Sequence, residues 1–144
     1  DRALIAGYDM VLSAYHGAPP GVLWEIAQME SSYDGDAEHD GGRGCGLFGM
    51  WMSTAEQIAR EPVTCDQLKD VGVAAGLAYL ELTMPHRCGR WKEWTTRVLC
   101  YRNGKDSAAV AAYRGRHWTA LPAGWGTRKL MARLWMDRWA KPRA

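Results

Sequence analysis

Apolar residues recur at the spacing of an α-helix along most of the chain, and no segment shows the two-residue alternation of a half-buried strand. The first helical segment carries apolar residues at i, i+4, i+7 and i+11, namely Leu4, Tyr8, Val11 and Tyr15. This spacing predicts an amphipathic helix, which the prolines and the glycine of residues 18–21 bring to an end.

A second helix is predicted from near Pro20 to about Ser32, because proline suits the first turn of a helix and Gly35 follows its end. Residues 34–46 hold five glycines and four acidic residues. That composition indicates a glycine-rich loop without regular structure.

Beyond this loop the pattern returns to helical spacing. A short helix capped by Ser53 or Thr54 runs through Arg60, and Pro85 closes a longer one. After the short helix, the others are expected at residues 66–83, 94–102, 107–113 and 127–139, with a turn at 121–126 before the last. No linker or internal repeat interrupts them, so we expect one all-α, predominantly helical domain over residues 1–144.

The composition is that of an ordinary globular protein, with 47% hydrophobic and 24% charged residues in 144. No apolar run approaches the about 20 residues that span a bilayer. The first residue is Asp1, and nothing near it resembles a signal peptide. We therefore expect a processed form or an excised domain. We also expect the chain to be a monomer.

The charges are divided unevenly along the chain. Residues 1–96 carry 14 acidic and 7 basic side chains, whereas residues 97–144 carry 2 acidic and 11 basic ones. Four of these cations and two tryptophans fall on the last predicted helix: Arg128, Lys129, Arg133, Arg138, Trp135 and Trp139. We expect this helix either to contact an anionic bacterial envelope or to be a solvated basic face.

The cysteines do not have the spacing of a metal site. Cys45, Cys65, Cys88 and Cys100 include no C-x-x-C pair, and the four histidines are scattered. Two disulfides in one of three pairings, or buried free thiols, both fit an even count.

Glu30 stands out on physical grounds. It follows Leu23, Ile26 and Ala27 at i, i+3, i+4 and i+7, so a carboxyl group ends the apolar stripe of its helix, whereas Glu25 is expected to be a surface charge. Apolar surroundings raise the pKa of a carboxyl group, which then stays protonated near neutral pH and can act as a general acid.

Four short motifs, in order, resemble the soluble lytic transglycosylase family and goose-type lysozymes. They are MESSY at residues 29–33, GCGLFGM at 44–50, LCYRNG at 99–104, and WTALP at 118–122 followed by GTR at 126–128. The chain departs from the pattern at three positions, because Cys45 replaces an aromatic residue, Gly49 a glutamine and Arg102 an asparagine.

The resemblance implies a lysozyme-like domain with a glycine-rich active-site loop. It also implies cleavage of the β-1,4 bond between N-acetylmuramic acid and N-acetylglucosamine in bacterial peptidoglycan, with Glu30 as catalytic acid and neither metal nor cofactor. The residues implied to contact the glycan strand are Ser31, Gly46, Leu47, Phe48 and Tyr101, together with Asn103, which lies one place after the expected asparagine. The expected location is outside the cytoplasm, in the periplasm or cell wall, with a bacteriophage lysin or virion enzyme the favoured setting.

Two mechanisms remain open at this point. A lytic transglycosylase uses one glutamate as acid and then as base, and leaves 1,6-anhydro ends. A hydrolase of the goose type adds a second carboxylate as base, for which Asp40 is the candidate, since a further aspartate of that family falls on Trp51. The single-acid route is our preferred prediction, and Asp40 is equally well explained as a turn residue.

Other classes of function are weaker alternatives. The acids at 34, 36, 38 and 40 alternate as in a calcium loop, but His39 and Cys45 stand where such a loop has glycine and glutamate. Residues 44–49 match a dinucleotide fingerprint without the strand that must precede it. A non-catalytic glycan-binding module retains the same motifs, and nucleic-acid binding is not expected.

Overall fold

The structure, a computed structural model, describes residues 2–103, and 65% of this part is helical. The predominantly helical fold expected from the periodicity is thereby confirmed. The described helices are α1 (Arg2–His16), α2 (Val22–Ser31), α3 (Met52–Ala59), α4 (Cys65–Lys69), α5 (Val71–Thr83) and α6 (Trp94–Asn103), with 3-10 turns η1 (Asp40–Gly42) and η2 (Cys88–Arg90). The helices predicted at 107–113 and 127–139, and with them the basic C-terminal segment, lie outside the described residues.

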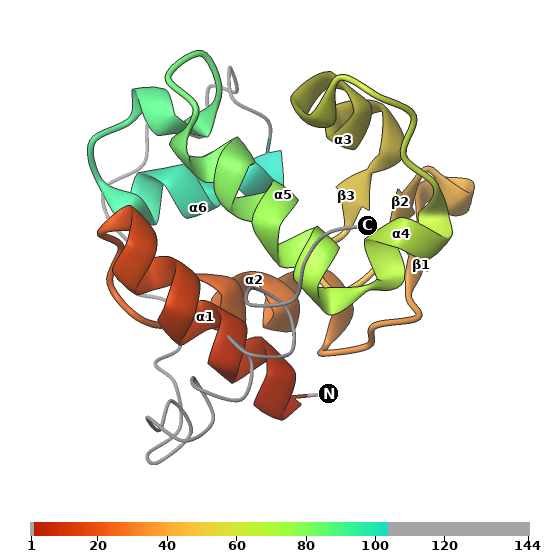
Figure 1. Ribbon diagram of the computed structural model, residues 1–144, viewed down its shortest axis with the longest axis horizontal. Helices are drawn as coiled ribbons and strands as arrows, with labels where there is room; N and C mark the ends of the chain where they lie inside the picture. Colours follow the sequence, from red (N-terminus) through yellow and green to blue (C-terminus); the bar gives the residue numbers. More distant parts are fainter. Residues whose placement is uncertain (1, 104–144) are drawn as a thin grey trace, which may run out of the picture.

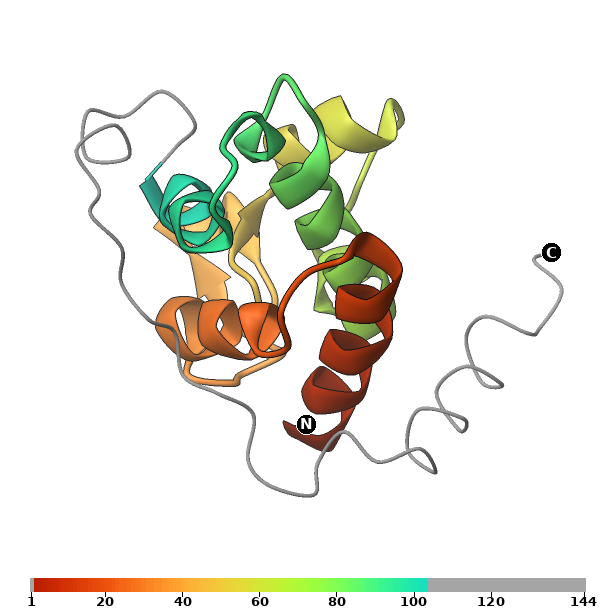
Figure 2. The same ribbon diagram turned by 90° about the vertical axis from the view of Figure 1, so that its left-hand side faces the viewer.

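Helix α5 lies between two groups of elements (Figure 1). It packs against α1 and α6 on one side and against α3 and α4 on the other. The turned view shows α1 and α2 side by side (Figure 2). Among residues 2–103, no helix is long and apolar enough to cross a membrane.

Two clusters of buried side chains correspond to these two groups. The larger joins α1, α2, α5 and α6, and the smaller lies beneath α3 and α4. Helix α5 supplies Ala75, Ala78 and Leu82 to the first and Leu77 to the second. A helix enclosed on several sides needs apolar residues nearly all round, which explains its composition.

Two helices begin at places other than those predicted. The prediction of a single helix over residues 66–83 is wrong, because Asp70 is extended and separates α4 from α5. Its side chain accepts a hydrogen bond from the N–H of Val73 and so caps the start of α5. Helix α3 begins after Trp51 without a side-chain cap, so the predicted caps at Ser53 and Thr54 are also wrong.

The first helix forms where it was predicted, with a different buried face. Ile5, Tyr8 and Leu12 are buried, whereas Tyr15 is 81% exposed. The prediction was wrong for Tyr15, because packing against both α2 and α5 turns the face that begins at Ile5 toward the core.

The glycine-rich segment contains a small sheet that the sequence analysis did not predict. Strands β1 (Glu38–His39), β2 (Gly44–Cys45) and β3 (Met50–Trp51) form an antiparallel sheet in the order β1-β2-β3. In its register His39 lies opposite Gly44, and Gly44 opposite Trp51.

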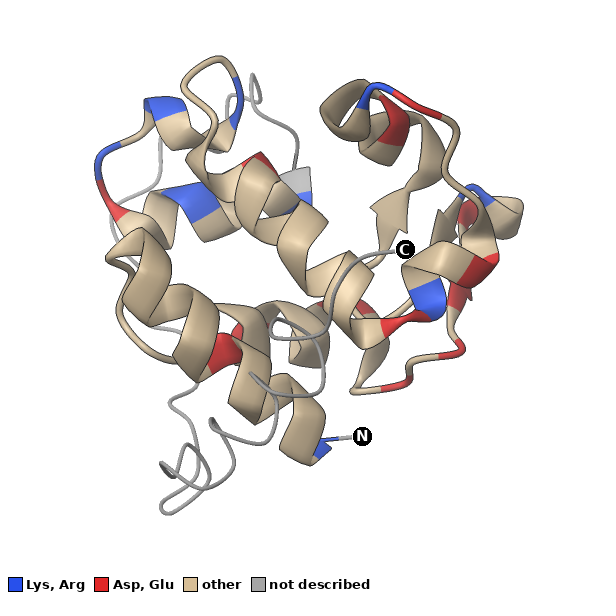
Figure 3. Ribbon diagram, in the orientation of Figure 1, with Lys and Arg blue, Asp and Glu red and all other residues tan. Residues whose placement is uncertain are grey.

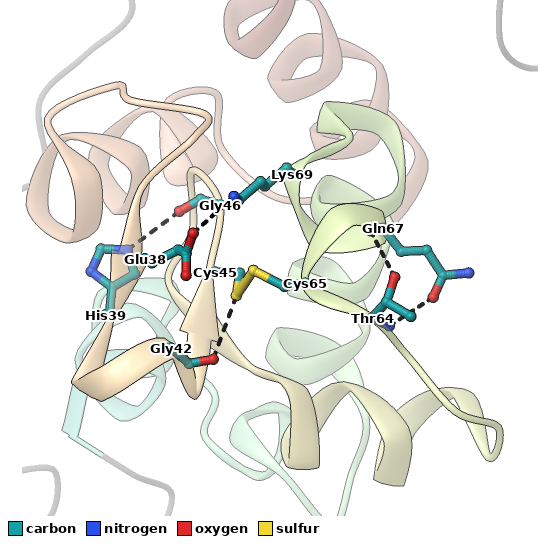
Figure 4. Close-up of a disulfide and its surroundings, with 9 residues drawn as sticks. All are labelled: Glu38, His39, Gly42, Cys45, Gly46, Thr64, Cys65, Gln67 and Lys69. Carbon is teal, nitrogen blue, oxygen red and sulfur yellow. Dashed lines mark hydrogen bonds and ion pairs between the residues drawn. A yellow bond between two sulfur atoms is a disulfide. The ribbon is translucent and has the colours of Figure 1, made fainter.

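Two disulfides resolve the alternatives left open for the cysteines. Cys45–Cys65 ties β2 to α4 (Figure 4), and Cys88–Cys100 ties η2 to α6. Near the first bond, Lys69 of α4 pairs with Glu38 of β1 at 3.0 Å (Figure 4). Acidic residues of the 34–40 segment and of α4 lie in the same part of the molecule (Figure 3). The sheet is therefore joined to α4 by one covalent bond and one exposed ion pair.

A buried carboxylate fixes the beginning of α2, the helix that carries Glu30. Asp9 of α1 is fully buried, and its two oxygens accept hydrogen bonds from the N–H groups of Gly21 at 2.7 Å and Trp24 at 2.9 Å. A helix leaves its first N–H groups without partners, so Asp9 caps α2 from another helix. Burial raises the pKa of Asp9 to about 6, against the lowering effect of the hydrogen bonds from Gly21, Trp24 and Leu23.

The free energy of unfolding should therefore depend on Asp9 between pH 4 and pH 6. In this window the folded chain holds a proton that the unfolded chain releases, so stability falls as the pH rises. A shift from 3.8 to about 6 corresponds to about 3 kcal/mol. Thermal unfolding of Asp9→Asn and of the parent should be followed from pH 4 to pH 7. The melting temperature of the variant should rise by several degrees relative to that of the parent as the pH rises. A difference that stays constant over this range would contradict the assignment.

Candidate functional site

Glu30 lies at the end of α2, and its side chain is 26% exposed. Leu23, Ile26 and Ala27 are fully buried, as the spacing predicts. Glu25 was predicted to be a surface charge, and this is wrong: it is buried with the rest of residues 22–27 of α2, a helix against which both α1 and α6 pack. Only the last turn of the helix opens toward solvent, and Glu30 is on it.

A close contact with the chain after β2 positions the Glu30 carboxyl group. Gly49 has φ +59°, and a Cβ at this residue would lie 3.0 Å from Oε2 and 3.2 Å from Cβ of Glu30. A side chain at residue 49 would therefore compete with the carboxyl group for the same space. This explains why glycine suits the place where the resembling family has glutamine.

Helix α6 closes the other side of the site. The Tyr101 hydroxyl donates a hydrogen bond of 2.8 Å to the carbonyl oxygen of Phe48, which precedes Gly49. The next residue, Arg102, brings its Nε to 3.7 Å from Oε1 of Glu30. A half-exposed ion pair thus lies where the family pattern has a neutral amide.

Burial is the main influence on the Glu30 carboxyl group, and it raises the pKa. The positive charges of Arg102 and His39 lower the pKa, and the negative charge of Asp40 raises it. The net shift is upward, as the sequence analysis predicted from the apolar stripe. Glu30 is therefore a carboxyl group with an increased tendency to hold a proton and an exposed side from which to donate it.

The other predicted site residues near Glu30 hold the turn before β3 in place. Ser31 donates its hydroxyl to the carbonyl oxygens of Leu47 at 2.8 Å and Ala27 at 3.1 Å, which ties the end of α2 to the turn before β3. The side chains of Leu47 and Phe48 are buried in the larger core cluster, so they anchor the turn to the core. Gly46 is buried too, with its N–H bonded to the carbonyl oxygen of Ala37.

Asp40 lies on η1, exposed and close enough to influence Glu30 electrostatically. Its Oδ2 accepts a hydrogen bond of 2.9 Å from the indole Nε1 of Trp51. Asn103 is the last residue of α6, and its side chain is outside what the structure describes. The structure therefore brings Glu30, Ser31, Tyr101 and, by charge, Asp40 together.

Sequence reasoning missed Arg102, Gly49, His39 and Trp51 as members of this site. Arg102 and Gly49 depart from the family pattern, and Trp51 stands where that pattern has an aspartate. These departures were the features of the sequence that could have pointed to the three residues. His39 carried no such signal, because its place near Glu30 depends on β1 pairing with β2.

The acidic residues of the 34–40 segment do not converge. Glu38 pairs with Lys69, Asp40 bonds to Trp51, and the Asp34 carboxylate accepts the N–H of Asp36. Within residues 2–103, no three histidine, cysteine, aspartate or glutamate side chains meet where they could hold a metal ion.

Comparison of the chain with protein-family models, curated proteins and solved structures finds no match.

Proposed function

We propose that this chain cleaves the β-1,4 bond between N-acetylmuramic acid and N-acetylglucosamine of bacterial peptidoglycan, on a lysozyme-like domain, with Glu30 as the general acid. The observation that carries the proposal is the environment of Glu30. Its carboxyl group is desolvated enough to raise the pKa, yet a quarter of the side chain stays open to solvent. A proton donor to a glycosidic oxygen needs both properties.

The favoured reaction is that of a lytic transglycosylase. Protonated Glu30 gives its proton to the leaving oxygen as the bond to C1 of the muramic acid breaks. The resulting carboxylate then takes the proton of the 6-hydroxyl of the same sugar, whose oxygen bonds to C1. Glu30 returns to its starting state, and no water is consumed. Arg102 suits this cycle because it stabilises the carboxylate present between the two steps.

Hydrolysis with Asp40 as the second carboxylate is the alternative. The influence of its charge on the pKa of Glu30 favours this reading, since a base must lie near the acid. One of its oxygens already accepts a hydrogen bond from Trp51. A glycan-binding module without activity is a further candidate.

The products of digestion distinguish these candidates. Purified peptidoglycan incubated with the full chain should release muropeptides, which mass spectrometry can identify. Ends of the 1,6-anhydro type are expected, and they are lighter than reducing ends by one water molecule. Reducing ends would support the Asp40 route instead, and intact glycan that is bound without cleavage would contradict the enzymatic proposal.

The envelope setting is part of the same proposal. Two disulfides fit an oxidising compartment, where peptidoglycan is also found. A bacteriophage lysin or virion enzyme is the setting we favour.

Removing the Arg102 charge should change the pH dependence of cleavage. Its guanidinium lowers the pKa of Glu30, so in Arg102→Gln this pKa rises and the acid stays protonated to higher pH. The alkaline limb of the rate profile should move upward accordingly. Lys92→Gln is the matched control, because it removes one exposed positive charge just before α6. Equal profiles for both variants would mean that Arg102 does not act on the catalytic group.

A further inference from the structure

Trp51 is one of the large apolar residues that the described part of the chain leaves exposed, with 39% of its surface accessible. It ends β3, two residues after Gly49, which contacts Glu30. Two residues of chain span at most about 7 Å. The backbone of Trp51 therefore lies within about 7 Å of Gly49, the residue in contact with the acid, a separation on the scale of one pyranose unit.

The ring of Trp51 is held in one orientation. Its Nε1 donates to Oδ2 of Asp40 at 2.9 Å, and the Arg43 guanidinium lies 5.6 Å from the ring centroid. Across the sheet, the missing side chain of Gly44 leaves space for the indole, whose Cδ1 lies 3.1 Å from where a Cβ would be. A fixed aromatic ring loses little conformational freedom when a ligand packs against it.

The position of Asp40 also agrees with a supporting role. It has φ +51°, a left-handed conformation that is uncommon for residues other than glycine, asparagine and aspartate. That conformation places its carboxylate beside the indole of a residue 11 positions later. The Asp40 carboxylate is therefore placed to orient the Trp51 ring.

We propose that Trp51 is a stacking platform for a sugar ring of the glycan strand next to the bond that Glu30 cleaves, and that Asp40 is the positioning residue that orients it. The inference rests on the proposed function, because the ligand it names is the substrate of that reaction. Tryptophan suits the role because it combines a flat apolar face with a polar edge. In this proposal Asp40 orients the indole of Trp51 and is not the catalytic base.

Substitutions of Trp51 test the platform through the KM for uncrosslinked glycan strands. Trp51→Leu keeps apolar bulk on β3 without a flat ring, and should raise KM about tenfold while kcat changes little. Trp51→Phe keeps a flat ring and should stay much closer to the parent. Tyr15→Ala is the matched control, because it removes an 81% exposed aromatic ring from the end of α1. If Leu and Phe variants both bind like the parent, the platform does not exist.

Substitutions of Asp40 separate orientation from catalysis. Asp40→Ala releases the ring and should raise KM severalfold, whereas Asp40→Asn keeps an oxygen that accepts the indole N–H and should restore most of that loss. A base would respond differently, since both variants would lose at least roughly 10²-fold in kcat. That outcome would overturn the role given to Asp40 and leave the proposed cleavage standing.

Binding of chitotetraose, an N-acetylglucosamine tetramer, covers the case in which the chain cleaves nothing. Calorimetry should then show weaker binding for Trp51→Leu than for Trp51→Phe, which would support the platform although the proposed reaction had failed. Equal binding of the two variants, or no binding by the parent, would overturn the platform as well.

Discussion

Glu30→Gln is expected to lower the rate of peptidoglycan cleavage by at least roughly 10²–10⁴-fold, the usual contribution of a general acid. In the proposed cycle one carboxyl group donates a proton in the first step and accepts one in the second. An amide can do neither, so both steps lose their catalyst. Glutamine has nearly the same shape as glutamic acid, and its side chain fits the space that Gly49 leaves.

The measurement is the release of soluble muropeptides per unit time, made alongside thermal unfolding. Glu56→Gln is the matched control, because it removes an exposed carboxylate from α3 and should leave the rate unchanged. The melting temperatures of both variants should stay within a few degrees of the parent. Retention of more than about a tenth of the parent activity by Glu30→Gln would show that another group donates the proton.

The features that the sequence predicted correctly are those that depend on local periodicity. The spacing of Leu23, Ile26 and Ala27 placed α2 and put Glu30 at its end, and the upward shift of the Glu30 pKa followed from the apolar side of that helix. The ends of α2 and α6 were also predicted closely. In each case neighbouring residues on one helix carried enough information.

The features that the sequence did not predict depend on contacts between distant segments. Strands of two residues are too short to show any alternation, so β1, β2 and β3 had no pattern to find. Asp70 interrupts an otherwise continuous helical pattern, because its side chain caps a new helix. Glu25 is buried in a helix that contacts both α1 and α6, and its spacing on α2 alone could not reveal this.

The pairings of Arg102 with Glu30 and of Trp51 with Asp40 are of the same kind. Each joins side chains from different elements, and the fold must be known before they can be paired. Departures from a family pattern pointed to two of these residues without saying what they contact. The sequence thus singled out Glu30, and the tertiary structure identified the groups that surround it.

Gly46→Ala is expected to lower the free energy of unfolding strongly. Gly46 has φ +83°, and a Cβ there would lie 2.1 Å from the carbonyl oxygen and 2.9 Å from the carbonyl carbon of Leu68 in α4. Both atoms belong to backbone, and the Cys45–Cys65 disulfide holds α4 against β2 at this point (Figure 4). Relief therefore requires the sheet and α4 to move apart.

The left-handed backbone costs an alanine about 1–2 kcal/mol, and overpacking adds about 1–3 kcal/mol or more. Their sum is a large part of the about 5–15 kcal/mol that stabilises an ordinary domain, so thermal unfolding should shift down by about 10 °C or more. Gly41→Ala separates the two contributions, because Gly41 has φ +70° and a Cβ there would meet nothing within 4 Å. The control should lose only the conformational part. Equal shifts for the two variants would mean that β2 and α4 do not approach as closely as the structure has them, and the support beneath the Leu47–Gly49 turn that faces Glu30 would have to come from elsewhere.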